Sequence, residues 1–290
     1  MIDIPVEISG NCNLRCPNCN TARRLHIPYS EKRIDLKLDE KIIKYVPKNS
    51  RLLFVGIGEP LLTDSQKRIK NILDKRDDVT GFVQTNGTQK LIPELIQYVK
   101  ENRLEIGTSY DEHHEMGGRT QINIQTEFVE ALSLTVEKFS QYEKLDFEKL
   151  KKTFPNLKRI LIDPYLDKDN VSIISEFKEV EKTILHFKKN LKNTKIKVYT
   201  FLNTCFFDYP QNLKYCKDLL KETIEINKHF RYSKKDYLIA VEDFKQGNNI
   251  RILTNGEILT DLNSTFKSWN ELDKEKLTHN IQNYNFNLIK

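Results

Sequence analysis

The sequence predicts an α/β protein in which strands and helices alternate around a parallel sheet. Short apolar runs are each followed by a segment of helical period, and this alternation occurs six times. A strand that runs parallel to its neighbour needs a crossover connection, so the alternation favours a parallel sheet with helices outside it. The 290 residues can bury a full core, in one large domain or in one domain with an appendage.

Four of the expected strands lie in the first half of the chain. They cover residues 3–8, 51–56, 80–84 and 103–109. Helices are expected over residues 37–46, from Thr63 onward and over residues 91–101. Thr63 and Gln66 have the spacing of a capping box, which predicts that the second helix begins there.

The second half of the chain adds two strands before the pattern changes. A long helical region is expected over residues 122–153. The fifth and sixth strands, 157–163 and 195–202, each precede a helix, near 170–190 and 211–227 respectively.

The pattern changes near residue 230. Asn255-Gly256 lies between the apolar runs 249–253 and 257–261, which predicts a hairpin, and a helix is expected near 268–284. We therefore expect a core over residues 1–228 and a small C-terminal extension over residues 229–290.

Three cysteines follow the first expected strand with C-x3-C-x2-C spacing: Cys12, Cys16 and Cys19. Thiolates bind soft metals and iron–sulfur clusters, and three ligands would leave one iron of a four-iron cluster open. The alternative is a structural zinc site in an interaction module, with His26 as the nearby fourth ligand. A disulfide framework is disfavoured because the number of cysteines is odd and no signal peptide is seen.

The cysteine spacing resembles that of the radical S-adenosylmethionine (radical SAM) enzymes, and the Asn-Leu-Arg between the first two cysteines is common in that family. The resemblance implies a partial (β/α)6 barrel and one [4Fe-4S] cluster held by the three cysteines. In this family the open iron chelates SAM. An electron from a donor such as flavodoxin or ferredoxin then cleaves SAM to a 5′-deoxyadenosyl radical, which takes hydrogen from the substrate.

A second motif follows the second expected strand. Gly56-Ile57-Gly58-Glu59-Pro60 resembles the family's G-G-E-P motif, with Ile57 where a glycine usually stands. The resemblance implies that Gly58, Glu59 and Pro60 bind the methionine end of SAM, with Glu59 accepting a hydrogen bond from its ammonium. The alternative is an ordinary turn between a strand and a helix.

A third motif, Thr85-Asn86-Gly87-Thr88, resembles the family's T-N-G-T segment. We interpret it mostly as a turn that also packs near SAM, because Asn-Gly adopts positive φ readily.

The fourth motif, Thr108-Ser109-Tyr110-Asp111, resembles the family's S-x-D pattern. The resemblance implies that Ser109, or else Asp111, contacts the SAM ribose. In the polar loop that follows, it implies that Arg119 meets the SAM carboxylate. His113 and His114 are adjacent in this loop, so their side chains point apart and cannot both ligate one metal well. The alternative to a functional role for these histidines is a solvated loop.

Two further segments remain open to both kinds of interpretation. Asp163-Pro164-Tyr165 lies where the family often contacts adenine or ribose, whereas Asp169-Asn170 is better explained as a helix N-cap. The C-terminal hairpin resembles a SPASM-like extension without its cluster cysteines. Because Cys205 and Cys216 cannot hold a cluster alone, we expect one cluster and two structural thiols, a radical-relay thiol being the alternative.

Composition constrains the partners. The net charge of +6 comes from 47 basic and 41 acidic residues that are interleaved along the chain, so nucleic acid is not the favoured substrate. We expect a peptide or small-metabolite substrate, and tRNA or deazapurine modification is the alternative. The sequence contains no apolar run of about 18 residues, and its reduced cysteines predict the cytoplasm.

Overall fold

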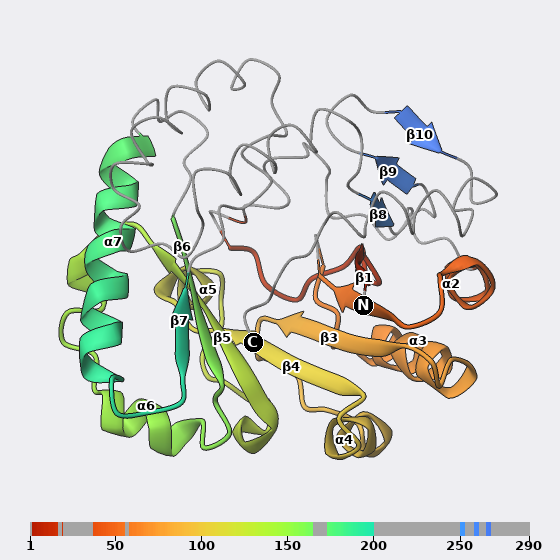
Figure 1. The fold of residues 1–290 in the computed structure, drawn as a ribbon, viewed down its shortest axis with the longest axis horizontal. Coiled ribbons are helices and arrows are strands. Elements are labelled where there is room, and N and C mark those ends of the chain that lie inside the picture. Colours follow the sequence, from red (N-terminus) through yellow and green to blue (C-terminus); the bar gives the residue numbers. More distant parts are fainter. Residues whose placement is uncertain are drawn as a thin grey trace.

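Parallel strands form a curved sheet whose carboxyl ends meet at one edge (Figure 1). The computed structural model describes residues 2–16, 19, 37–55, 58–164, 173–199, 250–252, 258–260 and 265–267. Seven parallel strands are found within these ranges: β1 (Ile2–Val6), β2 (Ser50–Phe54), β3 (Thr80–Thr85), β4 (Leu104–Ser109), β5 (Val129–Val136), β6 (Arg159–Pro164) and β7 (Lys197–Tyr199). The expected α/β class with a parallel sheet is therefore confirmed.

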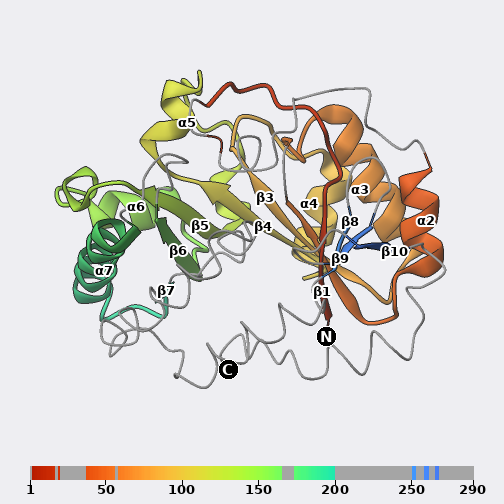
Figure 2. The same ribbon diagram turned by 90° about the horizontal axis from the view of Figure 1, so that it is seen from above.

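The spatial order of these strands follows the chain from β1 to β7. With right-handed crossovers, an order that never reverses puts the connecting helices on one face and curls the sheet toward a barrel. Figure 2 shows the helices outside the arc of the sheet. They are α2 (Leu38–Tyr45), α3 (Thr63–Lys75), α4 (Pro93–Lys100), α5 (Glu112–Met116), α6 (Phe147–Thr153) and α7 (Ile173–Asn190), with 3-10 turns η2 (Thr126–Phe128) and η3 (Phe139–Gln141). Among the described helices, none is both long and apolar enough to span a bilayer.

Three short strands extend the sheet beyond β1: β8 (Ile250–Ile252), β9 (Ile258–Thr260) and β10 (Thr265–Lys267). β8 pairs with β9 and β9 with β10, both antiparallel, and β8 meets β1 through the parallel pair Val6 and Ile252. The two strands of the expected hairpin are therefore present, and the third was not predicted. The expected helices near 211–227 and 268–284 lie outside the described residues.

The helical region predicted over residues 122–153 was wrong. Its centre is β5, the 3-10 turns η2 and η3 flank that strand, and only its last part is α-helical, as α6. Burial alternates along most of β5, with Leu132, Leu134 and Val136 buried and the residues between them half-buried. This period of two and the β-branched Val and Thr residues are typical of a strand. Within the described residues, β1 to β7 therefore make seven parallel strands where six were predicted.

The capping box predicted at Thr63 was also wrong. Leu62 is at the N-cap of α3, and its side chain makes no capping bond. The Gln66 amide instead donates to the carbonyl oxygens of Leu61 and Lys90 at 2.7 and 2.9 Å and accepts from Ile92 N at 2.9 Å. Gln66 thus joins α3 to the segment before α4.

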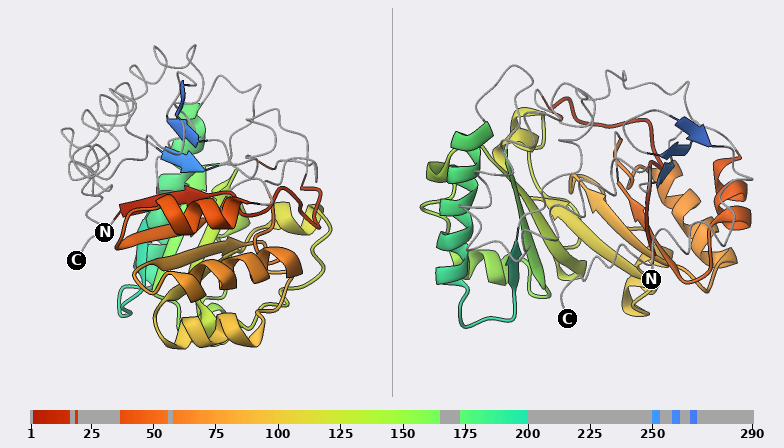
Figure 3. Two further views of the ribbon diagram at one scale, coloured as in Figure 1. Left: turned by 90° about the vertical axis from the view of Figure 1, so that its right-hand side faces the viewer. Right: turned by 45° about the horizontal axis from the view of Figure 1, so that its top comes forward.

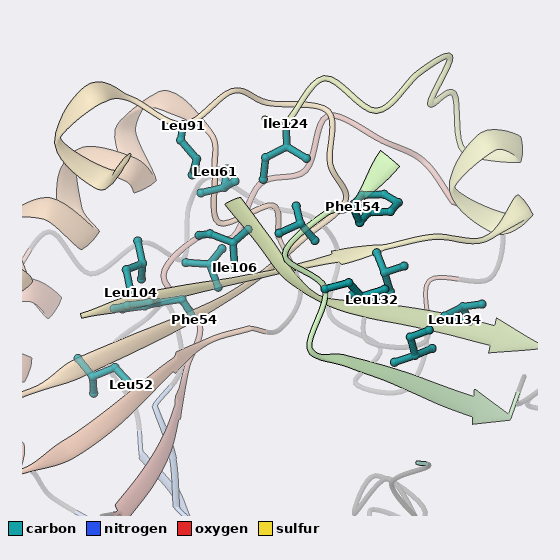
Figure 4. Packing of buried hydrophobic residues seen from close by; sticks show 14 of the residues in the cluster. Leu52, Phe54, Leu61, Leu91, Leu104, Ile106, Ile124, Leu132, Leu134 and Phe154 are labelled. Atoms are coloured by element: carbon teal, nitrogen blue, oxygen red, sulfur yellow. The ribbon is translucent and has the colours of Figure 1, made fainter. Parts of the chain in front are cut away.

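The core lies between the sheet and its helices (Figure 4). Leu52, Phe54 and Ile106 from the strands are fully buried, as are Ile69 and Ile72 from α3. Leu52 and Phe54 lie two residues apart on β2, so their side chains point to the same side of the sheet. The core therefore fixes which face of each strand is covered by helices.

The opposite face of the sheet carries charge near the amino ends of the strands. Arg51 of β2 and Arg159 of β6 both pair with Glu105 of β4, and both guanidinium groups lie over the ring of Phe82. In parallel barrels, residues at the amino ends of the strands usually contribute to stability, whereas residues at the carboxyl ends carry out the chemistry.

The burial of β2 predicts how two leucine variants differ. Leu52→Ala removes a fully buried side chain, so the free energy of unfolding should fall by about 2–5 kcal/mol. Leu185→Ala makes the same chemical change at a site that is 42% exposed, and should cost well under about 1 kcal/mol. Urea unfolding followed by circular dichroism measures both. Equal losses would contradict the packing of β2.

Candidate functional site

The loop after β1 carries the three cysteines along the carboxyl edge of the sheet. In Figure 2 and in both views of Figure 3 this loop runs from β1 toward α5. Arg15 N donates to Gly117 O at 3.0 Å, which fixes that approach, and Cys19 N donates to Cys16 O at 3.1 Å. Leu14, between the first two cysteines, is buried.

The thiols lie near enough to affect one another. Burial, and then the charges of Cys19 and Cys12, raise the pKa of Cys16 to about 12. Burial is also the main cause that raises the pKa of Cys12, against a lowering effect of the hydrogen bond from Leu14 N to its Sγ. A bound cation would reverse these shifts because metal ligation favours the thiolate.

Within the described ranges, no three His, Cys, Asp or Glu side chains gather around a point that one metal ion could occupy. Zinc draws all its ligands to one centre, whereas each thiolate of a four-iron cluster binds a different iron. The three thiols lie on one loop and affect one another electrostatically, and Cys12 Sγ accepts a hydrogen bond from Leu14 N. These features suit the ligands of an iron–sulfur cluster. His26, the candidate fourth zinc ligand, lies outside the described residues.

The loop after β2 packs tightly on the cysteine loop through Gly58. A Cβ at this position would overlap the carbonyl oxygens of Ser9 and Asn11, so glycine is required for the close approach. The next residue, Glu59, donates its backbone N–H to Asn11 O at 2.7 Å, and Pro60 is buried beside it. Gly56 and Ile57 lie outside the described residues.

The Glu59 carboxylate is almost fully buried, with 1% of the residue exposed. Oε1 accepts from Leu61 N at 2.8 Å and Thr85 Oγ1 at 2.6 Å, and Oε2 accepts from Asn86 N at 2.7 Å. Burial raises the pKa of Glu59, while these hydrogen bonds act to lower it. The carboxylate thus ties the loop after β2 to the end of β3, and its role toward an ammonium stays a prediction.

The loop after β3 reaches the cysteines through Asn86. Asn86 Nδ2 lies 3.6 Å from Cys12 Sγ and 3.0 Å from Asn13 Oδ1, in each case as donor. Asn13 also donates to Thr88 Oγ1 at 2.7 Å. The segment predicted mostly as a turn therefore contacts the candidate ligand Cys12, which sequence reasoning missed.

Asp111, after β4, is buried and faces His114. Its Oδ1 accepts from His114 N at 3.2 Å and lies 2.7 Å from His114 Nδ1. Burial raises the pKa of Asp111, but the hydrogen bonds and charge of His114, with the charge of Arg119, outweigh it and lower the pKa below its ordinary value. The spacing i, i+3 between an Asp and the helix it precedes is an N-cap pattern that the sequence contained. Contact with a ribose stays a prediction.

Arg119 lies buried at the centre of these strand ends. Its guanidinium donates to the carbonyl oxygens of Asn86, Ser109 and Asp111 at 3.1, 2.5 and 2.9 Å. Burial lowers its pKa, although the charges of Asp111 and Glu115 act in the opposite direction. Ser109 Oγ is half-buried and accepts from Gln84 Nε2 at 3.4 Å.

Gly117 packs directly on Cys16. A Cβ at Gly117 would lie 2.5 Å from Cys16 Sγ and 2.8 Å from Cys16 N, distances that real side chains do not adopt. The sequence placed Gly117 in a polar loop without giving it a role.

The segment predicted after the fifth expected strand, and the last two cysteines, fall largely outside the described ranges. Pro164 is the last residue of β6, while Tyr165, Asp169, Asn170, Cys205 and Cys216 lie outside the described residues.

Comparison with known proteins identifies the fold. No protein-family model matches the chain, and no curated protein matches it. The structure of Streptococcus suis SuiB bound to S-adenosylmethionine matches over 96% of this chain and 67% of its own, with 12% identity and a TM-score of 0.57. A second SuiB structure gives 13% identity over the same shares and a TM-score of 0.56. BtrN in complex with AdoMet and 2-DOIA has a TM-score of 0.32, which is too low to support an argument. At these identities the likeness to SuiB shows the fold alone.

Glu59→Gln should weaken the site without changing its shape. An amide in either orientation turns an NH₂ group toward the N–H of Leu61 or Asn86, leaving a buried donor unpaired. The expected loss is about 1–3 kcal/mol of unfolding free energy. Glu94→Gln, on the exposed surface of α4, is the matched control and should change little. Equal stability of the two variants in urea would contradict the bracing role of Glu59.

Gly117→Ala should displace Cys16. We expect faster alkylation of Cys16 in the metal-free protein, read by peptide mass spectrometry, and a loss of about 1–3 kcal/mol in stability. Met116→Ala changes the neighbouring residue, which is 60% exposed, and should leave both quantities near the wild-type values. An unchanged alkylation rate in Gly117→Ala would show that the contact does not constrain Cys16.

Proposed function

We propose that the protein is a radical SAM enzyme that cleaves S-adenosylmethionine reductively and uses the resulting 5′-deoxyadenosyl radical on a peptide or small-metabolite substrate. The main support is the way the loops after β2 and β3 and the α5 region bond or pack onto the cysteine loop. Glu59 N bonds to Asn11 O, Asn86 bonds to Cys12, and Gly117 O bonds to Arg15 N. The likeness in fold to SuiB, which was crystallised with S-adenosylmethionine, adds to this support.

Cys12, Cys16 and Cys19 are the residues that would hold a [4Fe-4S] cluster. When bound, the cluster would supply the electron for cleavage of SAM and an open iron for its amino and carboxylate groups. The chain's own residues would exclude water and hold the cofactor: Leu14 is buried between the ligands, and the neighbouring loops cover the cysteine loop. This arrangement leaves the chemistry to the cofactors and the positioning to the protein.

The proposed SAM contacts come from three strand ends. Gly58, Glu59 and Pro60 would take the methionine end. Because the Glu59 carboxylate already accepts three hydrogen bonds, we propose that it acts by fixing this loop. Ser109, or else Asp111, would contact the ribose.

Arg119 is the proposed source of positive charge for the SAM carboxylate. Three of its five N–H donors bond to carbonyl oxygens, so its position is set before the cofactor arrives. We further propose a flavodoxin- or ferredoxin-type electron donor and a cytoplasmic setting.

The proposal is tested by metal content and products. Anaerobically reconstituted protein should hold about four iron and four sulfide per chain, and the variant with Cys12, Cys16 and Cys19 all changed to Ala should hold none. With dithionite, the wild type should convert SAM slowly to 5′-deoxyadenosine and methionine. The reason is that binding at the open iron brings the sulfonium next to the electron source.

The matched control changes the two remaining cysteines. The variant with Cys205 and Cys216 changed to Ala should retain all its iron, as expected for one cluster. S-adenosylhomocysteine as the only product would indicate methyl transfer, and one zinc per chain without iron would indicate the zinc module. Either result would reject the proposal.

A further inference from the structure

The side chain of Asn86 is held in one orientation. Its Oδ1 accepts from Thr88 N at 3.0 Å and from Thr88 Oγ1 at 2.7 Å, while Nδ2 donates to Asn13 Oδ1 and Cys12 Sγ. Turning the amide over would place Oδ1 against two acceptors and Nδ2 against the Thr88 N–H. The hydrogen-bond network therefore assigns the NH₂ group to the sulfur side.

The backbone of Asn86 is held as firmly. Its N–H donates to Glu59 Oε2 at 2.7 Å, and its carbonyl oxygen accepts from Arg119 Nη1 at 3.1 Å. Only 6% of Asn86 is exposed. Groups from the loops after β1 and β2 and from the segment after α5 thus fix one amide donor against Cys12.

A donor held in this way has an electrostatic effect on a ligating sulfur. Hydrogen bonds to the sulfurs are among the features that set the potential of an iron–sulfur cluster. Reduction adds negative charge, part of which lies on the thiolate sulfurs, so a fixed N–H stabilises the reduced form more than the oxidised form. Loss of the donor should therefore make reduction harder.

We propose that Asn86 is a positioning residue that sets the reduction potential of the cluster by donating a hydrogen bond from Nδ2 to Cys12 Sγ. This inference rests on the proposed function, since it needs the cluster. Cys12 Sγ also accepts a hydrogen bond from Leu14 N at 3.4 Å, so it receives one bond from the backbone and one from the Asn86 side chain. Asn86 can be replaced without changing the ligand set, which makes its contribution separable.

The test compares Asn86→Ala and Asn86→Asp with wild type, as reconstituted protein without SAM. Asn86→Asp keeps the acceptor for Thr88 and replaces the donor with a second, charged acceptor. The readout is the midpoint potential from a titration followed by electron paramagnetic resonance, together with iron content. We expect a more negative midpoint in both variants. A tenfold loss in the reduction equilibrium of Asn86→Ala corresponds to ~59 mV for one electron, and Asn86→Asp should shift further.

Asn123→Ala is the matched control. Asn123 donates to Thr88 O at 3.2 Å, so its loss loosens the same loop without removing a bond to sulfur. Its midpoint should equal that of the wild type. Wild-type midpoints in both Asn86 variants at full iron content would overturn the inference, as would an equal shift in Asn123→Ala.

Variants that fail to load are covered by a second substitution. If Asn86→Ala binds no cluster, Asn86→Ser is measured in its place, because serine keeps a polar group that is too short to reach the sulfur. A more negative midpoint potential in Asn86→Ser would support the inference, and a wild-type midpoint would overturn it. Loss of loading in both, repeated in Asn123→Ala, would overturn the inference by showing a general effect on the loop. A wild type without a four-iron cluster would instead reject the proposed function, and this inference with it.

Discussion

The buried carboxylate of Glu59 is the interaction on which the arrangement of the strand ends depends. A carboxylate removed from water is costly unless its oxygens are hydrogen-bonded, and here two backbone N–H groups and one hydroxyl satisfy it. Those donors belong to the loop after β2 and to the end of β3, while Glu59 N reaches the cysteine loop at Asn11. Glu59 therefore sets the relative positions of the loops after β1, β2 and β3. Asn86 can contact Cys12 only when these three loops hold those positions.

Arg119 makes the complementary connection on the side of β4. Its buried guanidinium is surrounded by carbonyl oxygens from two strand ends, and Asp111 nearby is ionised and paired with His114. An Arg fork suits this task because its planar donors fix several acceptors at once. The Glu59 carboxyl group and the Arg119 guanidinium both bond to the backbone of Asn86. Hydrogen bonds thus hold one short segment from two sides.

This rigidity bears on the proposed chemistry. A cofactor with its own reactivity needs a protein that holds it still and tunes its charge, and the strand-end loops provide fixed donors rather than mobile side chains. Gly58 and Gly117 allow the neighbouring chain segments to approach the cysteine loop closely, which no larger residue would permit. The fold shared with SuiB at 12% identity is compatible with this reading, because a parallel sheet gathers its loops at one edge whatever their sequence.

Local patterns were enough to predict the α/β class, six of the parallel strands and the two hairpin strands, because each depends on neighbours in the chain. The alternation of Leu132, Leu134 and Val136 is also visible in the sequence. β5 was missed because a helical period was assigned to this segment. What only the tertiary structure decided is which groups meet across loops: hydrogen bonds join Gln66 to Lys90, Glu59 to Asn86 and Asn86 to Cys12, and Gly117 packs against Cys16. These partners are 24 to 101 residues apart (66 to 90, and 16 to 117). No local propensity encodes such pairs, since they form when parallel pairing brings the carboxyl ends of separate strands to one edge.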